Sequence, residues 1–165
     1  MTRILPLLLL AACVWSTPGD GPANQGAEAD AAGLVQVDRQ GLRAHMTAPA
    51  DHVRVYNLWA TWCAPCIAEM PELMAFDDAH PEIDLWFVNT DHPKMADKKL
   101  PRFIERHGLQ GRRHLRPSPG ESDVTAAIPE VPSVLPTTYV VGKSGTVTHT
   151  FRGRVGRDQL ERVVR

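Results

Sequence analysis

Apolar and polar residues alternate in several short stretches of the chain, the pattern typical of β-strands. Residues 52–60 and 83–89 are strongly apolar, and 52–60 carries apolar groups on both faces at its end, which indicates a central strand. Residues 34–38 and 42–46 flank Gly41, and this arrangement predicts a β-hairpin. Further strands are expected at residues 112–116, 137–142 and 146–153, the last two forming a second hairpin.

The period of the apolar residues changes from two to about 3.6 after Cys63, which predicts an α-helix with Pro71 in its interior. A second amphipathic helix is expected over 94–108, and a third over 156–164. The residues of the second helix that should face inward are Met95, Leu100, Phe103 and Ile104. This order of strands and helices predicts an α/β sandwich around a mixed sheet.

The first 13 residues have the outline of a secretion signal, with an Arg, an apolar run and small residues before Cys13. The apolar run covers only residues 4–12, whereas a membrane-spanning helix needs about 20 apolar residues. The end of the run, LAAC, resembles the lipobox of bacterial lipoproteins, in which the cysteine is lipidated. This resemblance implies an exported protein attached to the membrane through Cys13. The alternative is an ordinary cysteine in a leader that is cleaved elsewhere.

Residues 14–33 consist mostly of small and polar residues, which cannot bury enough surface to offset their ordering entropy. We therefore expect a flexible linker there and one folded domain over residues 34–165, active as a monomer. The chain has 18 Lys and Arg against 19 Asp and Glu, so no global field points to nucleic acid as a partner.

Cys63 and Cys66 form a CxxC motif, which occurs in metal sites, structural disulfides and redox centres. Structural zinc usually needs four ligands, but the chain has one CxxC and scattered histidines. A copper site is less easily dismissed, with His45 and Met46, or His92, as candidate further ligands. A purely structural disulfide would stabilise little, because its ring is short and the entropic effect grows with loop length.

A redox centre fits the local pattern better than a metal site or a structural disulfide. Cys63 stands between a predicted strand and a predicted helix, where backbone N–H groups and the helix dipole favour the thiolate. Cys63 would form a mixed disulfide with a substrate, and Cys66 would then displace the product and close the ring. This chemistry needs no cofactor or metal beyond the Cys63–Cys66 disulfide itself.

Two stretches resemble the thioredoxin superfamily, in particular its exported, membrane-tethered TlpA/ResA group: NLWATWCAPCIAEMPEL around the cysteines, and LPTTYVV further on. The resemblance covers residues 34–165 and implies a thioredoxin-like fold, with a central mixed β-sheet, helices on both faces and the N-terminal β-hairpin as an extension. It also implies a cis peptide bond before Pro136, which the following TT pair favours over Pro129 and Pro132.

The same resemblance assigns substrate-binding roles to five residues around the cysteine pair. Trp62 would shield the pair, Pro65 would tune its reduction potential, and Pro136 would lie against it. The backbone of Leu135 would pair with an extended substrate, with Thr137 beside it.

Many thioredoxins carry an aspartate six residues before the first cysteine, but here that position is Asn57, which cannot titrate. Glu69 follows Cys66 by three residues, on the same helical face, and matches a glutamate of the TlpA/ResA signature. We expect Glu69 to be partly buried, to have a raised pKa and to take the proton from Cys66. The alternative is that Glu69 is a solvated helix residue.

The resemblance implies a reductase of disulfides in exported proteins, such as apocytochrome c or copper-site assembly proteins, on the periplasmic side of a bacterial envelope. A membrane thiol-reductant donor would recharge it. A copper-binding chaperone that uses the CxxC pair is the alternative. The basic residues of segment 112–116 are expected at a solvated edge, and Lys94, Lys98 and Lys99 on the exposed face of their helix.

Overall fold

The computed structural model of the chain describes residues 34–121, 123–128 and 134–164. The predicted leader, its Cys13, the linker over residues 14–33, Pro129 and Pro132 lie outside these residues. Within them, no helix is long and apolar enough to cross a membrane.

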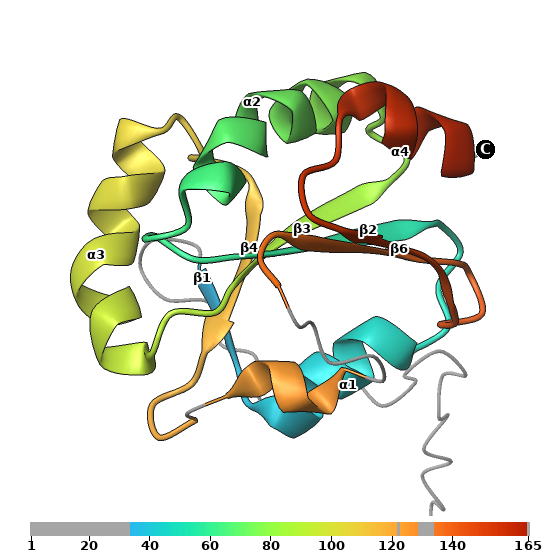
Figure 1. Ribbon diagram of the computed structural model, residues 1–165. Coiled ribbons are helices and arrows are strands. Elements are labelled where there is room, and N and C mark those ends of the chain that lie inside the picture. Colours follow the sequence, from blue (N-terminus) through green and yellow to red (C-terminus); the bar gives the residue numbers. More distant parts are fainter. Residues whose placement is uncertain (1–33, 122, 129–133, 165) are drawn as a thin grey trace, which may run out of the picture.

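A six-stranded mixed sheet forms the centre of the described part of the chain, with the strand order β1-β4-β3-β2-β5-β6 (Figure 1). β1, β4, β3 and β2 are parallel to one another, whereas β5 and β6 are antiparallel to their neighbours. The strands are β1 Leu34–Val37, β2 Arg54–Trp59, β3 Asp84–Asn89, β4 Arg113–Pro117, β5 Thr137–Val141 and β6 Val147–Arg152. The predicted mixed sheet and the predicted second hairpin are confirmed.

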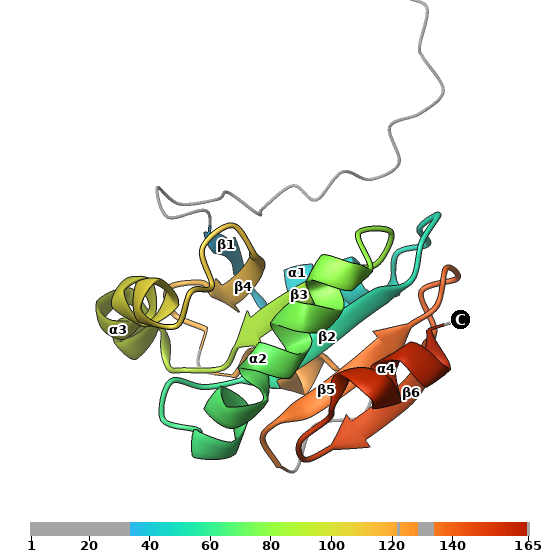
Figure 2. The ribbon, with the colours of Figure 1, turned by 90° about the horizontal axis from the view of Figure 1, so that it is seen from above.

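Helices cover both faces of this sheet, as the resemblance to thioredoxins implied (Figure 1). The helices are α1 Arg39–Thr47, α2 Ala64–Ala79, α3 Pro93–Arg106 and α4 Arg157–Val163, with a short 3-10 helix, η1, at Val124–Ala127. α2, α3 and α4 pack on one face, while α1 and the residue after η1, Ile128, pack on the other. Seen from above, α3 lies at the β1 and β4 side of the sheet and α4 over the β5 and β6 side (Figure 2).

β2 is the central strand that carries the chain into α2. All six of its residues are buried, because β3 and β5 flank it and helices cover both of its faces. Val55 and Trp59 face the α2 side, whereas Tyr56 and Leu58 face the α1 side. The predicted central strand is therefore confirmed. The loop that carries the first cysteine follows its carboxyl end and leads into α2.

The predicted N-terminal β-hairpin is wrong. β1 pairs in parallel with β4, and the residues that follow β1 form helix α1 rather than a second strand. Asp38 caps this helix by accepting a hydrogen bond from the Gly41 N–H (2.6 Å), so Gly41 lies in the first helical turn instead of breaking a strand. Leu42 and Met46, four residues apart, form the buried stripe that holds α1 on the sheet.

Two smaller expectations also fail. The segment 112–116 does not form a solvated edge, because β1 covers β4 on that side and buries His114 and Arg116. In α3, the predicted inward residue Met95 is 40% exposed, while Ala96 takes the buried position beside it. The three lysines of α3 are exposed, as predicted.

Candidate redox site

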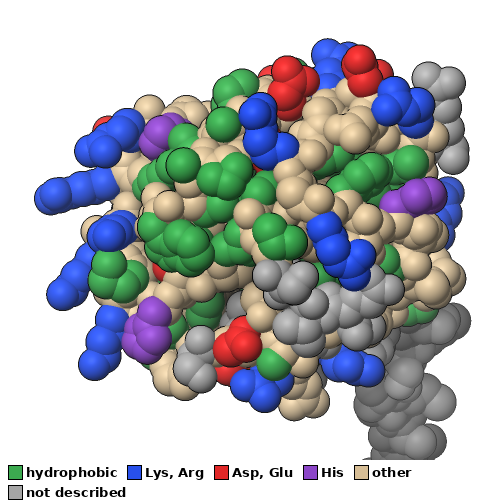
Figure 3. Space-filling view, viewed as in Figure 1, with side chains coloured by type: hydrophobic (Ala, Val, Ile, Leu, Met, Phe, Trp, Pro, Cys, Tyr) green, Lys and Arg blue, Asp and Glu red, His purple; other side chains and the backbone are tan. Residues whose placement is uncertain are grey.

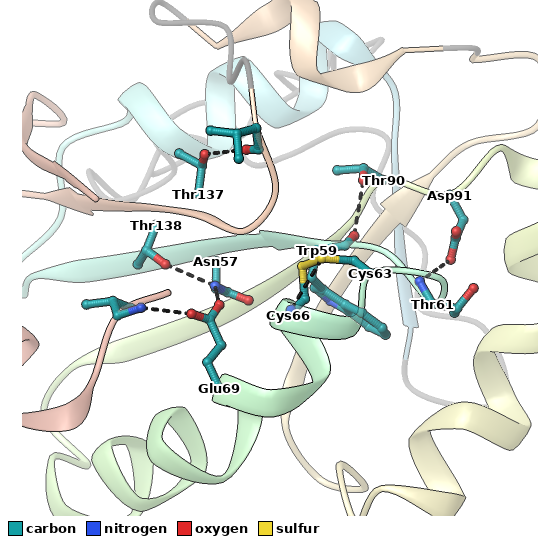
Figure 4. The surroundings of a disulfide bond; sticks show 12 residues. Asn57, Trp59, Thr61, Cys63, Cys66, Glu69, Thr90, Asp91, Thr137 and Thr138 are labelled. Atoms are coloured by element: carbon teal, nitrogen blue, oxygen red, sulfur yellow. Dashed lines mark hydrogen bonds between the residues drawn. A yellow bond between two sulfur atoms is a disulfide. The ribbon is translucent and has the colours of Figure 1, made fainter. Parts of the chain in front are cut away.

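The two cysteines lie where β2 ends and α2 begins (Figure 4). Cys63 is the N-cap residue of α2, Cys66 lies in its first turn, and a disulfide joins their sulfur atoms. Cys66 has no exposed surface and Cys63 retains 4%, so Cys63 is the sulfur that a partner meets first. This order of exposure agrees with the roles expected for attacking and resolving cysteines.

The start of α2 creates a positive electrostatic environment for Cys63. The backbone N–H of Cys66 donates a hydrogen bond to Cys63 Sγ (3.3 Å), and the 16-residue helix directs the positive end of its dipole toward the same atom. Both effects stabilise a negative charge on Cys63 more than on Cys66, which lies inside the helix. The position of Cys63 therefore favours it over Cys66 as the attacking sulfur.

A buried carboxylate that sequence reasoning missed holds the loop before Cys63. Asp91 follows β3 and is 2% exposed, and its Oδ2 accepts hydrogen bonds from the Thr61 N–H and from Asn89 Nδ2, both at 3.0 Å. Thr90 adds two hydrogen bonds to the carbonyl oxygen of Trp59. In the sequence, the sign of this role is that Thr90 and Asp91 directly follow a buried strand. The parallel neighbours β2 and β3 end at the same edge of the sheet, so residues after β3 can reach the loop after β2.

A cavity of about 630 Å³ opens beside Cys63. The loop and the start of α2 contribute Trp62 and Pro65, and the segment before β5 contributes Val134 and Leu135. Trp62 is 70% exposed and lines this cavity beside Cys63, which itself retains 4% exposure. Three of the five residues predicted to bind substrate thus line a single cavity.

The other two predicted residues follow directly in the chain. The Leu135–Pro136 peptide bond is cis, as predicted, and Pro136 is buried. The Thr137 hydroxyl donates to the Val134 carbonyl oxygen (2.7 Å), which fixes the bend before β5. The Pro136 carbonyl oxygen accepts from the Gly153 N–H (2.9 Å), so β6 supports the same bend.

Glu69 is buried, so the alternative of a solvated helix residue is wrong. Its side chain is 1% exposed, and Figure 4 shows it directed from α2 toward β2, on the sheet-facing side that also carries Cys66. Oε1 accepts a hydrogen bond from Asn57 Nδ2 (2.7 Å), and Oε2 accepts one from the Val155 N–H (2.9 Å). Burial raises the pKa of Glu69 above its usual value, although these two hydrogen bonds oppose the shift.

Asn57 links this carboxylate to the sheet. Its Nδ2 donates both to Glu69 and to the Thr138 hydroxyl (2.9 Å), which determines the orientation of the amide because a carboxylate only accepts. Its Oδ1 is buried and has no hydrogen-bond partner within the described residues. The result is an unused acceptor on the β2 side of the disulfide (Figure 4).

The candidate copper ligands are not gathered around the cysteines. His45 and Met46 lie at the end of α1, beside Arg54 at the start of β2, which is the end of that strand opposite to the cysteine loop. His92 caps α3 by accepting from the Lys94 N–H. Among the described residues, no three His, Cys, Asp or Glu side chains form a group that could hold a metal ion.

Comparisons with known proteins agree with this geometry. No family model matches the chain. The thiol-disulfide oxidoreductase ResA of Geobacillus kaustophilus is 31% identical over 108 residues, which make up 64% of this chain and 58% of that protein, so the match spans little more than half of that relative. ResA of Geobacillus thermodenitrificans is 27% identical, with 98% of this chain and 91% of that protein covered.

A solved structure extends the likeness to the fold. The crystal structure of a DsbF homologue from Corynebacterium diphtheriae superposes with a TM-score of 0.57 at 26% identity, over 69% of this chain and 71% of that one. Sequence, fold and the arrangement of the cysteine pair lead to one conclusion. The chain has a thioredoxin-like fold and is similar to ResA thiol-disulfide oxidoreductases.

Proposed function

We propose that this protein reduces disulfide bonds in exported proteins, with Cys63 as the attacking sulfur and Cys66 as the resolving one. The observation that carries the proposal is the position of Cys63 at the start of α2, hydrogen-bonded by the helix backbone and open to a cavity on its other side. A structural disulfide would need no such opening beside one of its sulfurs.

The reaction proceeds by two exchanges. The Cys63 thiolate attacks one sulfur of the substrate disulfide; a Cys63–substrate bond forms, the substrate disulfide breaks, and its other sulfur leaves as a thiolate that takes up a proton. The Cys66 thiolate then attacks Cys63 Sγ, the Cys63–Cys66 disulfide forms, and the second substrate thiolate leaves. Two electrons pass from the protein dithiol to the substrate.

The second exchange requires Cys66 to lose a proton in a place that water does not reach. Glu69, with its raised pKa, is the base we assign to this step, since it faces the sheet one helical turn beyond Cys66. Asn57 holds the carboxylate in place, and its unused Oδ1 is suited to accept a hydrogen bond from the Cys66 thiol in the reduced protein. Both groups act on Cys66 rather than on the substrate.

The cavity beside Cys63 fits an extended polypeptide better than a small disulfide. Trp62 and Val134 are two of the three large apolar side chains that are well exposed within the described part of the chain, and both line this cavity. Val134 and Leu135 line the cavity ahead of β5, so the backbone of this segment is suited to pair with a substrate strand.

The location and the substrates that we propose are based on the leader sequence and on the similarity to ResA. Export and attachment through Cys13 would place the domain on the periplasmic side of the envelope, tethered by residues 14–33. Apocytochrome c and copper-site assembly proteins are the substrates we propose there, with a membrane thiol-reductant donor returning the pair to the dithiol. A copper-binding chaperone would use the same two cysteines without turnover.

Trapping tests the proposal. In Cys66→Ala, the second exchange is removed, so Cys63 should hold its substrate as a mixed disulfide that is isolated from cells and released by a reductant. Cys63→Ala is the matched control and should hold nothing. If no protein adduct forms on Cys63 in cells that express the full chain, the proposal is wrong.

A further inference from the structure

The exposed side of α3 carries four cations that we call the basic face: Lys98, Lys99, Arg102 and Arg106. None of the four forms an ion pair with a residue that the structure describes, in contrast to the arginines of β4. Of the two acids in α3, Asp97 pairs with Arg116 instead, and Glu105 forms no ion pair with any described residue.

This arrangement works against the stability of the helix. Lys98 and Arg102, and Arg102 and Arg106, are four residues apart, and Lys99 lies three residues before Arg102. Like charges at these spacings destabilise a helix. The chain as a whole has a net charge of −1, so the positive charge here is a local feature rather than a consequence of a basic protein.

The basic face adjoins the redox site. Its four cations line a hollow of about 270 Å³ together with Phe103 and Thr61. Thr61 is the residue before Trp62, which lines the cavity beside Cys63, so the hollow and the cavity lie on the two sides of one short loop. Figure 3 shows Lys and Arg side chains along the edge that α3 occupies in Figure 1, next to a group of exposed apolar side chains.

We infer that the basic face binds acidic residues of a partner protein and thereby aligns the partner's disulfide with Cys63. The inference rests on the proposed reductase function and names the class of its substrate: a disulfide flanked by an acidic segment. A protein fits this position better than a lipid surface, because lipid headgroups pressed against α3 would also cover Trp62 and the opening to Cys63. The redox step is unchanged; only the rate of productive encounter depends on the basic face.

Two synthetic peptides test this inference. Both contain the same internal disulfide, and they differ only in a flanking run of four Glu or four Gln. With the protein prepared in the dithiol form, we expect the Glu peptide to be reduced about tenfold faster in 20 mM salt, and less than twofold faster in 500 mM salt, because salt screens exposed charges.

Matched charge variants locate the effect. Lys98→Gln/Arg102→Gln should lower the preference for the Glu peptide from about tenfold to about threefold or less, while reduction of the Gln peptide stays within twofold of the original protein. Lys143→Gln/Arg162→Gln removes the same two residue types far from Cys63, since Lys143 follows the end of β5 opposite to the cysteine loop and Arg162 lies near the end of α4. This control should keep the full preference.

Three outcomes overturn the inference. The first is an equal rate for both peptides at low salt, and the second is an equal loss of preference in the two variants. The third is binding of phosphatidylglycerol vesicles that depends on Lys98 and Arg102 without any preference between the peptides, which would assign the basic face to lipid. Failure to reduce either peptide would instead count against the proposed function.

Discussion

Glu69 is a carboxylic acid in the core of a small domain, and it lies one helical turn beyond Cys66, which must lose a proton in the proposed reaction. Its burial, its raised pKa and its hydrogen bonds to Asn57 and to the Val155 N–H are the features that a proton acceptor for Cys66 requires. A buried acid of this kind costs stability when it ionises, so its presence calls for a function.

Glu69→Gln should therefore slow disulfide reduction by about 100-fold at neutral pH, because the amide cannot take the Cys66 proton. The rate of the original protein should rise with pH through the raised pKa of Glu69, and the variant should lack this rise. Stopped-flow mixing of the reduced protein with a peptide disulfide measures both. Glu72→Gln, which changes an exposed carboxylate of the same helix, is the control.

The same variant has a second signature in stability. Because the folded protein holds the Glu69 proton more tightly than the unfolded chain does, folding is favoured at low pH and loses free energy as pH rises from about 4.5 through the raised pKa. The free energy of unfolding of the original protein should fall relative to that of Glu69→Gln over this range. A constant difference in unfolding free energy between the two proteins over this pH range would show that folding does not raise the pKa of Glu69.

At the scale of elements, the position of Cys63 depends on the loop between β2 and α2. Asp91 holds this loop from the end of β3, across 30 residues of chain, by accepting from the Thr61 N–H. The cysteine loop follows β2, and the side chain that holds this loop follows the neighbouring parallel strand β3.

Asp91→Ala should leave the Thr61 N–H and the Asn89 side chain without their buried acceptor and cost about 2–4 kcal/mol of unfolding free energy. Exchange of the Thr61 amide hydrogen with D₂O should accelerate at least tenfold, while amides in β5 keep their protection. Asp91→Asn retains one acceptor oxygen, so its unfolding free energy and its Thr61 exchange rate should fall between those of the original protein and those of Asp91→Ala. An unchanged Thr61 exchange rate in Asp91→Ala would mean that the loop is held by other contacts.

The sequence predicts the site better than it predicts the N-terminal elements. Cys63, Cys66 and Glu69 follow one another at helical spacing, so their shared face could be inferred from local periodicity alone. Helix α1 could not, since Gly41 suggests a turn until the Asp38 cap is seen. The role of Asp91 could not be predicted from the sequence either, because it depends on which strands are neighbours in the sheet.

At the scale of the whole molecule, the described arginines differ in how many of their charges are paired, depending on where they lie. Most arginines outside α3 that the structure describes are paired or cap a helix, as Arg54 does by donating to carbonyl oxygens at the end of α1. That end of the sheet also contains His45, whose Nδ1 lies 2.9 Å from the Tyr56 hydroxyl and whose ring packs edge-on against Trp86 at 4.5 Å. Burial, with a smaller contribution from Arg54, lowers the pKa of His45 to about 4.

This buried histidine should make the protein sensitive to acid. The unfolded chain takes up a proton at His45 near pH 6.5, whereas the folded protein resists it until about pH 4, so stability falls as pH falls between these values. His45→Gln should remove up to about 3 kcal/mol of this dependence. Urea unfolding at several pH values measures it, with His149→Gln, an exposed position on β6, as the control. Parallel curves for all three proteins would contradict this account.

The central claim is that the Cys63–Cys66 pair gives electrons to its substrates, and its reduction potential tests that claim most directly. Equilibration of the full chain with mixtures of reduced and oxidised dithiothreitol, followed by acid trapping and mass measurement, yields the potential. We expect about −250 mV or lower, near that of thioredoxin-type reductants. A value near −120 mV, typical of a strong protein oxidant, would contradict the proposed direction of electron flow.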